Sequence, residues 1–181
     1  MKKLVYMGLL LTLIVATACN GNKSAEESKT RVVLKDSVDA QGVQRMQSFK
    51  AEQTITFNNR EYHSLLHRVS CDSLARVRDS RGDVFVDNTI TLRLTRGTEK
   101  IFGKTFTKRD FAAWIGADFM KSGILEGMVF DKTTPQGFVY AVSVAYPQSD
   151  LYIPLSVTIS SNGTMSIAKE ELMEDIYTDE E

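Results

Sequence analysis

The chain has 181 residues, 43% of them hydrophobic, and its 22 basic and 23 acidic residues give a formal net charge of −1. This near-neutral balance argues against a nucleic-acid partner or another strongly charged polymer. With only two cysteines, no disulfide framework is expected, and the core has to be stabilised by burial alone.

The first 18 residues have the layout of an export signal. Two lysines near the start precede an apolar run that ends in the letters ATAC at 16–19. The run is shorter than the roughly 20 residues that a membrane-spanning helix needs. The sequence therefore predicts a signal peptide over 1–18 and a mature chain that begins at Cys19. An ordinary secretory signal with a chance cysteine is the alternative.

The ending ATAC resembles the lipobox of bacterial lipoproteins. This resemblance implies cleavage before Cys19, a diacylglycerol on its sulfur and an acyl chain such as palmitate on its amino group. Several acyl chains hold a protein firmly on a membrane, whereas one does so only marginally. Asn20 is not acidic, which by the same resemblance implies sorting to the outer membrane. The acids follow late, at Glu26 and Glu27, which favours the periplasmic side over the cell surface.

Composition divides the mature chain into three parts. Residues 19–50 are mostly polar and are expected to form a tether with little packing. Residues 51–169 carry most of the apolar residues and are expected to form one globular domain. The tail at 170–181 holds seven acids and no base, so it is expected to remain solvated.

Alternating polar and apolar residues predict a mostly β domain. In the run TITLRLT, three apolar residues face one way and the threonines and arginine face the other. Turn signals separate such runs at Asn58-Asn59, at 79–83, at Gly97-Thr98 and at Asn162-Gly163. We expect an antiparallel meander of about seven to nine strands, which forms either a sandwich or a partly open barrel.

One amphipathic helix is predicted to pack on this sheet. Thr107 and Asp110 have the spacing of a capping box. Apolar residues follow near helical spacing until Ser122-Gly123, namely Phe111, Trp114, Ile115 and Phe119.

Several of these stretches carry a further resemblance. DNTITLRLTR, KTFTKRDFAAWI, GILEGMVFD and SVAYPQSDLYIPLSVTISSNGTMSI are similar to an uncharacterised lipoprotein family of gut anaerobes, a domain of unknown function. The similarity covers roughly residues 49–169. It implies the envelope compartment and a mostly β fold, and it brings no activity, cofactor or site residue with it.

A candidate metal site lies in HSLLHRVSC. His63, His67 and Cys71 are four residues apart, so on a helix they would line one face and could bind zinc. On a strand the same spacing separates neighbours by about 13 Å, too far for a shared ion. The turn before this segment favours the strand, with two histidines at or near the surface and an inert thiol.

A candidate binding surface lies in AYPQSDLYIP, at 145–154. Tyr146 and Tyr152 flank Gln148 and Asp150 between two prolines. Aromatic rings beside amide and carboxylate groups are typical of sites that bind sugars or peptides. A hairpin connection stiffened by proline is the plainer interpretation.

No motif of a known catalytic class is present. We therefore expect a lipid-anchored envelope protein that acts as a noncatalytic binding or assembly module. Its partner would be a glycan or a protein, and no cofactor is expected. An envelope hydrolase or a metal-binding protein is the alternative, and a self-associating structural protein is a third class. Five arginines scattered among acids are expected to form a solvated face: Arg76, Arg78, Arg81, Arg93 and Arg96.

Overall fold

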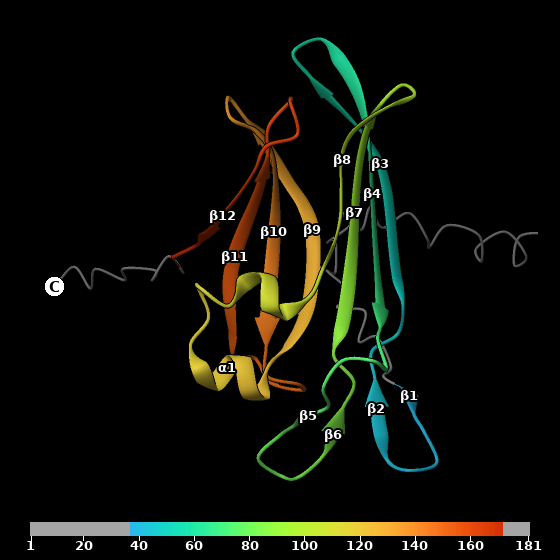
Figure 1. Cartoon of the computed structure of the whole chain (residues 1–181), viewed down its shortest axis with the longest axis vertical. Coiled ribbons are helices and arrows are strands. Elements are labelled where there is room, and N and C mark those ends of the chain that lie inside the picture. The colour runs from blue at the N-terminus through green and yellow to red at the C-terminus, as the bar shows by residue number, and fades with distance from the viewer. Residues whose placement is uncertain (1–36, 172–181) are drawn as a thin grey trace, which may run out of the picture. The chain divides into compact units, whose positions relative to one another are not determined.

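The computed structural model describes residues 37–171 (Figure 1). Three four-stranded sheets make up this part of the chain. In spatial order, the first large sheet contains β3 (Phe49–Phe57), β4 (Arg60–Ser70), β7 (Asn88–Arg96) and β8 (Glu99–Phe106). The second contains β12 (Met165–Lys169), β11 (Tyr152–Ile159), β10 (Gly137–Ala145) and β9 (Ile124–Thr134). A small sheet contains β1 (Ser37–Val38), β2 (Val43–Arg45), β6 (Val84–Phe85) and β5 (Val77–Arg78).

The expectation of a mostly β fold is confirmed, but the expected count of seven to nine strands is too low. Residues 37–171 form twelve strands, because the short strands of the small sheet have too few residues to show an alternating pattern. The pairing is also not wholly antiparallel, since β2 and β6 run parallel, with Val43 opposite Val84. The two large sheets pack against each other as a sandwich (Figure 1).

The folded domain begins earlier than residue 51. Residues 37–50, expected to belong to the tether, form β1, β2 and the start of β3. Asp39 organises the turn after β1, because its carboxylate accepts hydrogen bonds from the backbone amides of Gln41 and Val43, each at 2.9 Å. The predicted signal peptide, Cys19 and the tail from residue 172 lie outside the described residues.

The predicted turns join the strands where expected. Asn58 and Asn59 have φ of 50° and 57°, the left-handed conformation that a two-residue hairpin requires at both positions. They connect β3 to β4, with Phe57 opposite Arg60. Gly163, with φ of 85°, turns the chain from β11 into β12. The local turn chemistry thus determines these hairpins.

One apolar core lies between the large sheets. The first sheet contributes the predicted inward face of β7 to this core, where Ile90, Leu92 and Leu94 are buried. The second sheet contributes alternate residues of β10 and β11. Aromatic side chains of the two sheets pack against each other in this core, with the ring centroids of Tyr62 on β4 and Phe138 on β10 4.7 Å apart.

A buried hydroxyl pair also joins the sheets. The Tyr140 hydroxyl on β10 lies 2.9 Å from the Ser64 hydroxyl on β4, and both side chains are buried. Burial raises the pKa of Tyr140 from 10.0 to about 12, against a smaller lowering by the Ser64 hydrogen bond. The phenol therefore keeps its proton in the folded protein at a pH where the unfolded chain loses it.

This pair predicts a loss of stability in alkali. Between pH 10 and 12 the unfolded chain binds fewer protons, so the free energy of unfolding should fall by up to about 1.4 kcal/mol per pH unit. Tyr140→Phe should remove that part of the slope and, at pH 8, cost about 1 kcal/mol for the lost hydrogen bond. Urea unfolding of both proteins at pH 8 and from pH 9.5 to 11.5 measures the difference. Identical alkaline slopes would show that Tyr140 does not titrate in this way.

The region between β8 and β9 differs from the single predicted helix. It contains a 3₁₀ helix, η1 (Lys108–Phe111), a turn, and then α1 (Ala117–Ser122). Asp110 accepts hydrogen bonds from the amide and hydroxyl of Thr107, at 2.8 and 3.1 Å, and the predicted capping box is present at the start of η1. Phe111 is buried and stacks on Phe106, with centroids 5.8 Å apart. Within residues 37–171, no helix is long and apolar enough to cross a membrane.

Candidate functional site

A groove lies where two loops meet the end of α1. We name it the loop groove. It has a volume of about 590 Å³, within the range of small-molecule sites. The β5–β6 turn, the end of α1 and the β10–β11 connection line it, with Arg78, Asp79, Ser80, Arg81, Lys121, Ser122, Tyr146, Pro147, Gln148, Ser149 and Leu151.

The β10–β11 connection is shaped by its own hydrogen bonds. The amide of Tyr146 donates to the carbonyl of Leu151 at 3.0 Å, and the amide of Leu151 donates to the Ser149 hydroxyl at 3.0 Å. Gln148 takes a positive φ of 54°. The ring of Tyr146 stacks on Phe119 of α1, with centroids 4.2 Å apart. This stacking fixes the aromatic wall of the loop groove against the helix.

The opposite wall is the β5–β6 turn. The Asp79 carboxylate accepts hydrogen bonds from the amides of Arg81 and Asp83, each at 2.9 Å, and from Arg81 Nε at 3.0 Å. Burial raises the pKa of Asp79, and these hydrogen bonds lower it by more, so the group is held ionised. Arg81 also donates to Gln148 Oε1 at 2.8 Å, and Gln148 in turn donates to Gln44. The two walls are therefore linked across the groove.

The predicted binding residues separate into two pairs. Tyr146 and Gln148 line the loop groove, whereas Asp150 and Tyr152 do not. Tyr152 begins β11, where it pairs with Ala145, and its side chain is 42% exposed. The sequence interpretation missed Arg78, Arg81 and Lys121, which approach the loop only in the folded chain.

A second cavity of about 250 Å³ adjoins the groove, and Lys121 lines both. We name it the basic pocket. Its lining includes four basic side chains and one carboxylate. The complete lining is Ser73, Leu74, Ala75, Arg76, Val77, Asp87, Thr107, Lys108, Arg109, Met120 and Lys121. The five arginines expected on a solvated face are exposed or partly exposed, and three of them, Arg76, Arg78 and Arg81, line these two cavities.

The floor of the basic pocket is a buried ion pair. Lys108 Nζ lies 3.3 Å from Asp87 Oδ2 and also donates to the carbonyl of Gly123. Asp87 Oδ1 accepts from the amides of Asn88 and Leu125, each at 2.8 Å. These contacts attach η1 and the start of β9 to the start of β7, which positions the pocket's base.

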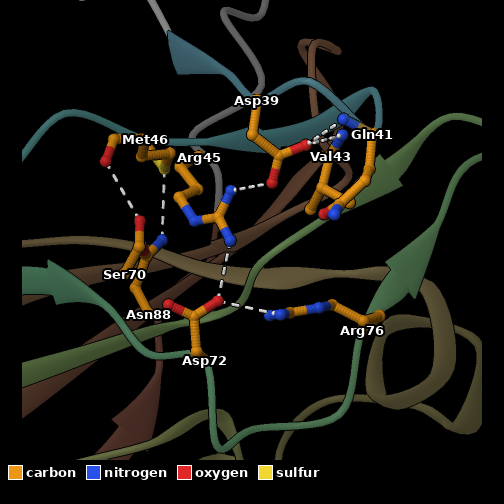
Figure 2. A network of polar contacts seen from close by, with 9 residues as sticks. All are labelled: Asp39, Gln41, Val43, Arg45, Met46, Ser70, Asp72, Arg76 and Asn88. Carbon is orange, nitrogen blue, oxygen red and sulfur yellow. Dashed lines mark hydrogen bonds and ion pairs between the residues drawn. The ribbon is translucent and has the colours of Figure 1, made fainter.

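Figure 2 shows how one wall of the basic pocket is attached to the small sheet. Asp72 Oδ1 accepts hydrogen bonds from Arg76 and Arg45, each at 2.8 Å, and Arg45 also pairs with Asp39. The hydrogen bond from Arg45, followed by that from Arg76, lowers the pKa of Asp72. Arg76 is therefore held in place by a carboxylate that it shares with Arg45.

The proposed metal ligands do not meet. Residues 60–70 form strand β4, so His63 and His67 lie on one exposed face, where the strand rise separates them by about 13 Å. Cys71 follows the strand, with its sulfur 3.1 Å from the Ser73 hydroxyl. Across residues 37–171, no group of three or more His, Cys, Asp or Glu side chains could hold a metal ion. The helical geometry that a zinc site needed here is absent because the segment pairs with β3 and β7.

These features define a β-sandwich protein with a loop-lined groove and a basic pocket at adjoining positions. Residues 28–167 match the model of a family described as a domain of unknown function (DUF4738), and the chain belongs to that family. No curated protein matches the chain. The membership agrees with the expected similarity to an uncharacterised family.

Proposed function

We propose that the protein is a lipid-anchored component of the cell envelope, held through Cys19, and that its β-sandwich is a noncatalytic module that binds an oligosaccharide in the loop groove. The anchor rests on the charged start, the short apolar run and the letters ATAC before residue 20. The outer membrane and its periplasmic side are proposed from Asn20 and the late acids.

The observation that carries the binding role is the composition of the loop groove. It combines an aromatic wall at Tyr146 with the amide of Gln148, three serine hydroxyls and two guanidinium groups. Saccharides present apolar ring faces edged by hydroxyls, so a few placed polar groups beside an aromatic ring suit them. The peptide alternative by strand addition has less support here, because α1 packs beside the edge strand β5.

The charge state of the carboxyl groups supports binding rather than hydrolysis. A general acid in a hydrolase requires a raised pKa. At Asp79 and Asp110 burial raises the pKa, but hydrogen bonds from Arg81 or Lys104 and from backbone amides lower it by more. In residues 37–171, the pKa is lowered at every carboxyl group with a clear shift, namely Asp39, Glu52, Asp72, Asp79 and Asp110.

A pair of matched substitutions tests the groove. Leu151 lines it and is 65% exposed, whereas Val129 on β9 is 50% exposed and lies outside it. The full chain in nonionic detergent is screened against a panel of oligosaccharides and peptides, and the best ligand is titrated. Leu151→Ser should weaken its binding about tenfold, because an apolar contact of this size contributes roughly 1.5 kcal/mol or more.

Val129→Ser should leave that affinity unchanged. Equal affinity for the wild-type protein and Leu151→Ser would remove the loop groove from the proposal. Selective binding of peptides over saccharides would replace the proposed ligand class.

A further inference from the structure

The basic pocket has more positive charge than its own carboxylate balances. Arg76, Lys108, Arg109 and Lys121 line it, with Asp87 as the one acid among the lining residues. Asp87 is fully engaged, since one oxygen accepts from two backbone amides and the other faces Lys108. A protein of net charge −1 therefore concentrates cations around a cavity.

Lys108 is the buried member of this group. Its side chain is 9% exposed, so its ammonium group is largely removed from water. An ammonium group has three donors, and within residues 37–171 Asp87 and the Gly123 carbonyl take two of them. The third donor is left for a group that enters the cavity, and a negative group there would reduce the cost of burying the charge.

Arg109 and Lys121 stand at the mouth. Both are exposed, and neither has an ion pair with another residue of the part that the structure describes. Arg76 differs, since Asp72 holds it in position. The pocket thus combines one oriented guanidinium, one buried ammonium and two cations without a carboxylate partner. Guanidinium groups favour planar, two-point contacts with oxyanions.

We propose that the basic pocket binds an oxyanion, a carboxylate, sulfate or phosphate group, carried by the saccharide whose ring lies in the loop groove. This inference rests on the proposed function and specifies its ligand. At about 250 Å³ the pocket is below the usual range for whole ligands, which suits one charged substituent. Lys121 lines both cavities, so the two parts of one ligand occupy adjoining sites.

The test compares sugars that share one ring and differ in one group. Glucose, glucuronate, glucose 6-sulfate and glucose 6-phosphate are titrated into the full chain in nonionic detergent at constant ionic strength. The midpoint of thermal unfolding is followed, because a ligand of the folded state raises it. At least one acidic sugar should bind tenfold or more tightly than glucose, and the strongest of the three identifies the anion.

Matched double variants separate the pocket from general charge and salt effects. Arg109→Gln/Lys121→Gln should reduce the affinity for that acidic sugar at least tenfold and remove its advantage over glucose, because charge-assisted hydrogen bonds are lost. Arg60→Gln/Lys169→Gln makes the same change of charge at two exposed residues outside the pocket and should keep the preference. The substituted side chains are exposed, so both variants should fold.

Two outcomes overturn the inference in different ways. If glucose and the acidic sugars bind equally and Leu151→Ser still weakens saccharide binding, the basic pocket is not an oxyanion site and the loop groove keeps its role. If none of the four sugars binds and the oligosaccharide panel also fails, the proposed function falls together with the inference.

Discussion

Replacing Cys19 with serine is expected to abolish lipid attachment and to release the protein from the membrane fraction. A hydroxyl cannot form the thioether that lipidation of a bacterial lipoprotein requires, so neither cleavage before residue 19 nor acylation of the new amino group should follow. Because several acyl chains together anchor a protein stably, whereas the unacylated chain has no such anchor, the loss should be close to complete. Metabolic labelling with an alkynyl palmitate and fractionation of the producing bacterium measure both effects.

The second cysteine provides the matched control. Cys71 directly follows β4, and its sulfur contacts the Ser73 hydroxyl. Cys71→Ser should keep full labelling and full membrane association. If Cys19→Ser is still labelled and sediments with membranes, the anchor lies elsewhere and the proposed compartment loses its basis.

Asp87→Ala is expected to give the largest loss of stability, about 3–5 kcal/mol in the free energy of unfolding. The change leaves the buried ammonium of Lys108 without its carboxylate and removes the acceptor of two backbone amides. Single domains are stable by only about 5–15 kcal/mol, so the variant should lie near the unfolding threshold. Urea unfolding followed by circular dichroism measures the loss.

Two further variants show whether the buried pair is the cause. Asp131 is 44% exposed and pairs with Lys132 at the surface, so Asp131→Ala should change stability by less than about 0.5 kcal/mol. Lys108→Met added to Asp87→Asn should cost less than the sum of the two single changes, because it removes the unpaired charge. Strict additivity would show that Lys108 and Asp87 do not depend on each other.

The candidate site is built on the same contacts that stabilise the fold. Lys108 and Asp87 form the base of the basic pocket and also connect η1 to β7 and β9. The walls of both cavities come from turns and loops that the strands hold in place. Substitutions at the mouth, such as those at Arg109 and Lys121, therefore test binding with less risk to folding than substitutions at the base.

Local chemistry alone identified several parts of the molecule. Asn58-Asn59 and Asn162-Gly163 predicted hairpins because few residues adopt the left-handed conformation that such turns need. The alternation in β7 predicted its buried face because successive side chains on a strand point to opposite sides. The turn at Asn58-Asn59 likewise favours a strand over 60–70, because a tight hairpin leads directly into a paired strand.

Other predictions failed where tertiary contacts outweigh local pattern. The run from Thr107 to Ser122 has helical spacing, yet it divides into η1 and α1, with Phe111 buried against Phe106 and Phe119 stacked on Tyr146. The small sheet was missed because its strands have only two or three residues each. Pairing partners far along the chain, such as Val43 and Val84, stabilise strands of that length.

The sequence by itself determined the mostly β class, the main hairpins and two of the residues that line the loop groove, and the prediction of an export signal with an anchor at Cys19 rests on it alone. Only the tertiary structure decided that Arg81 meets Gln148, 67 residues away, and that Lys108 meets Asp87 beneath a cavity. Strand alternation and turn chemistry depend on neighbours in the chain, so a single sequence displays them. A binding site depends on which loops the packed sheets bring together, and no local sequence pattern encodes contacts between residues so far apart in the chain.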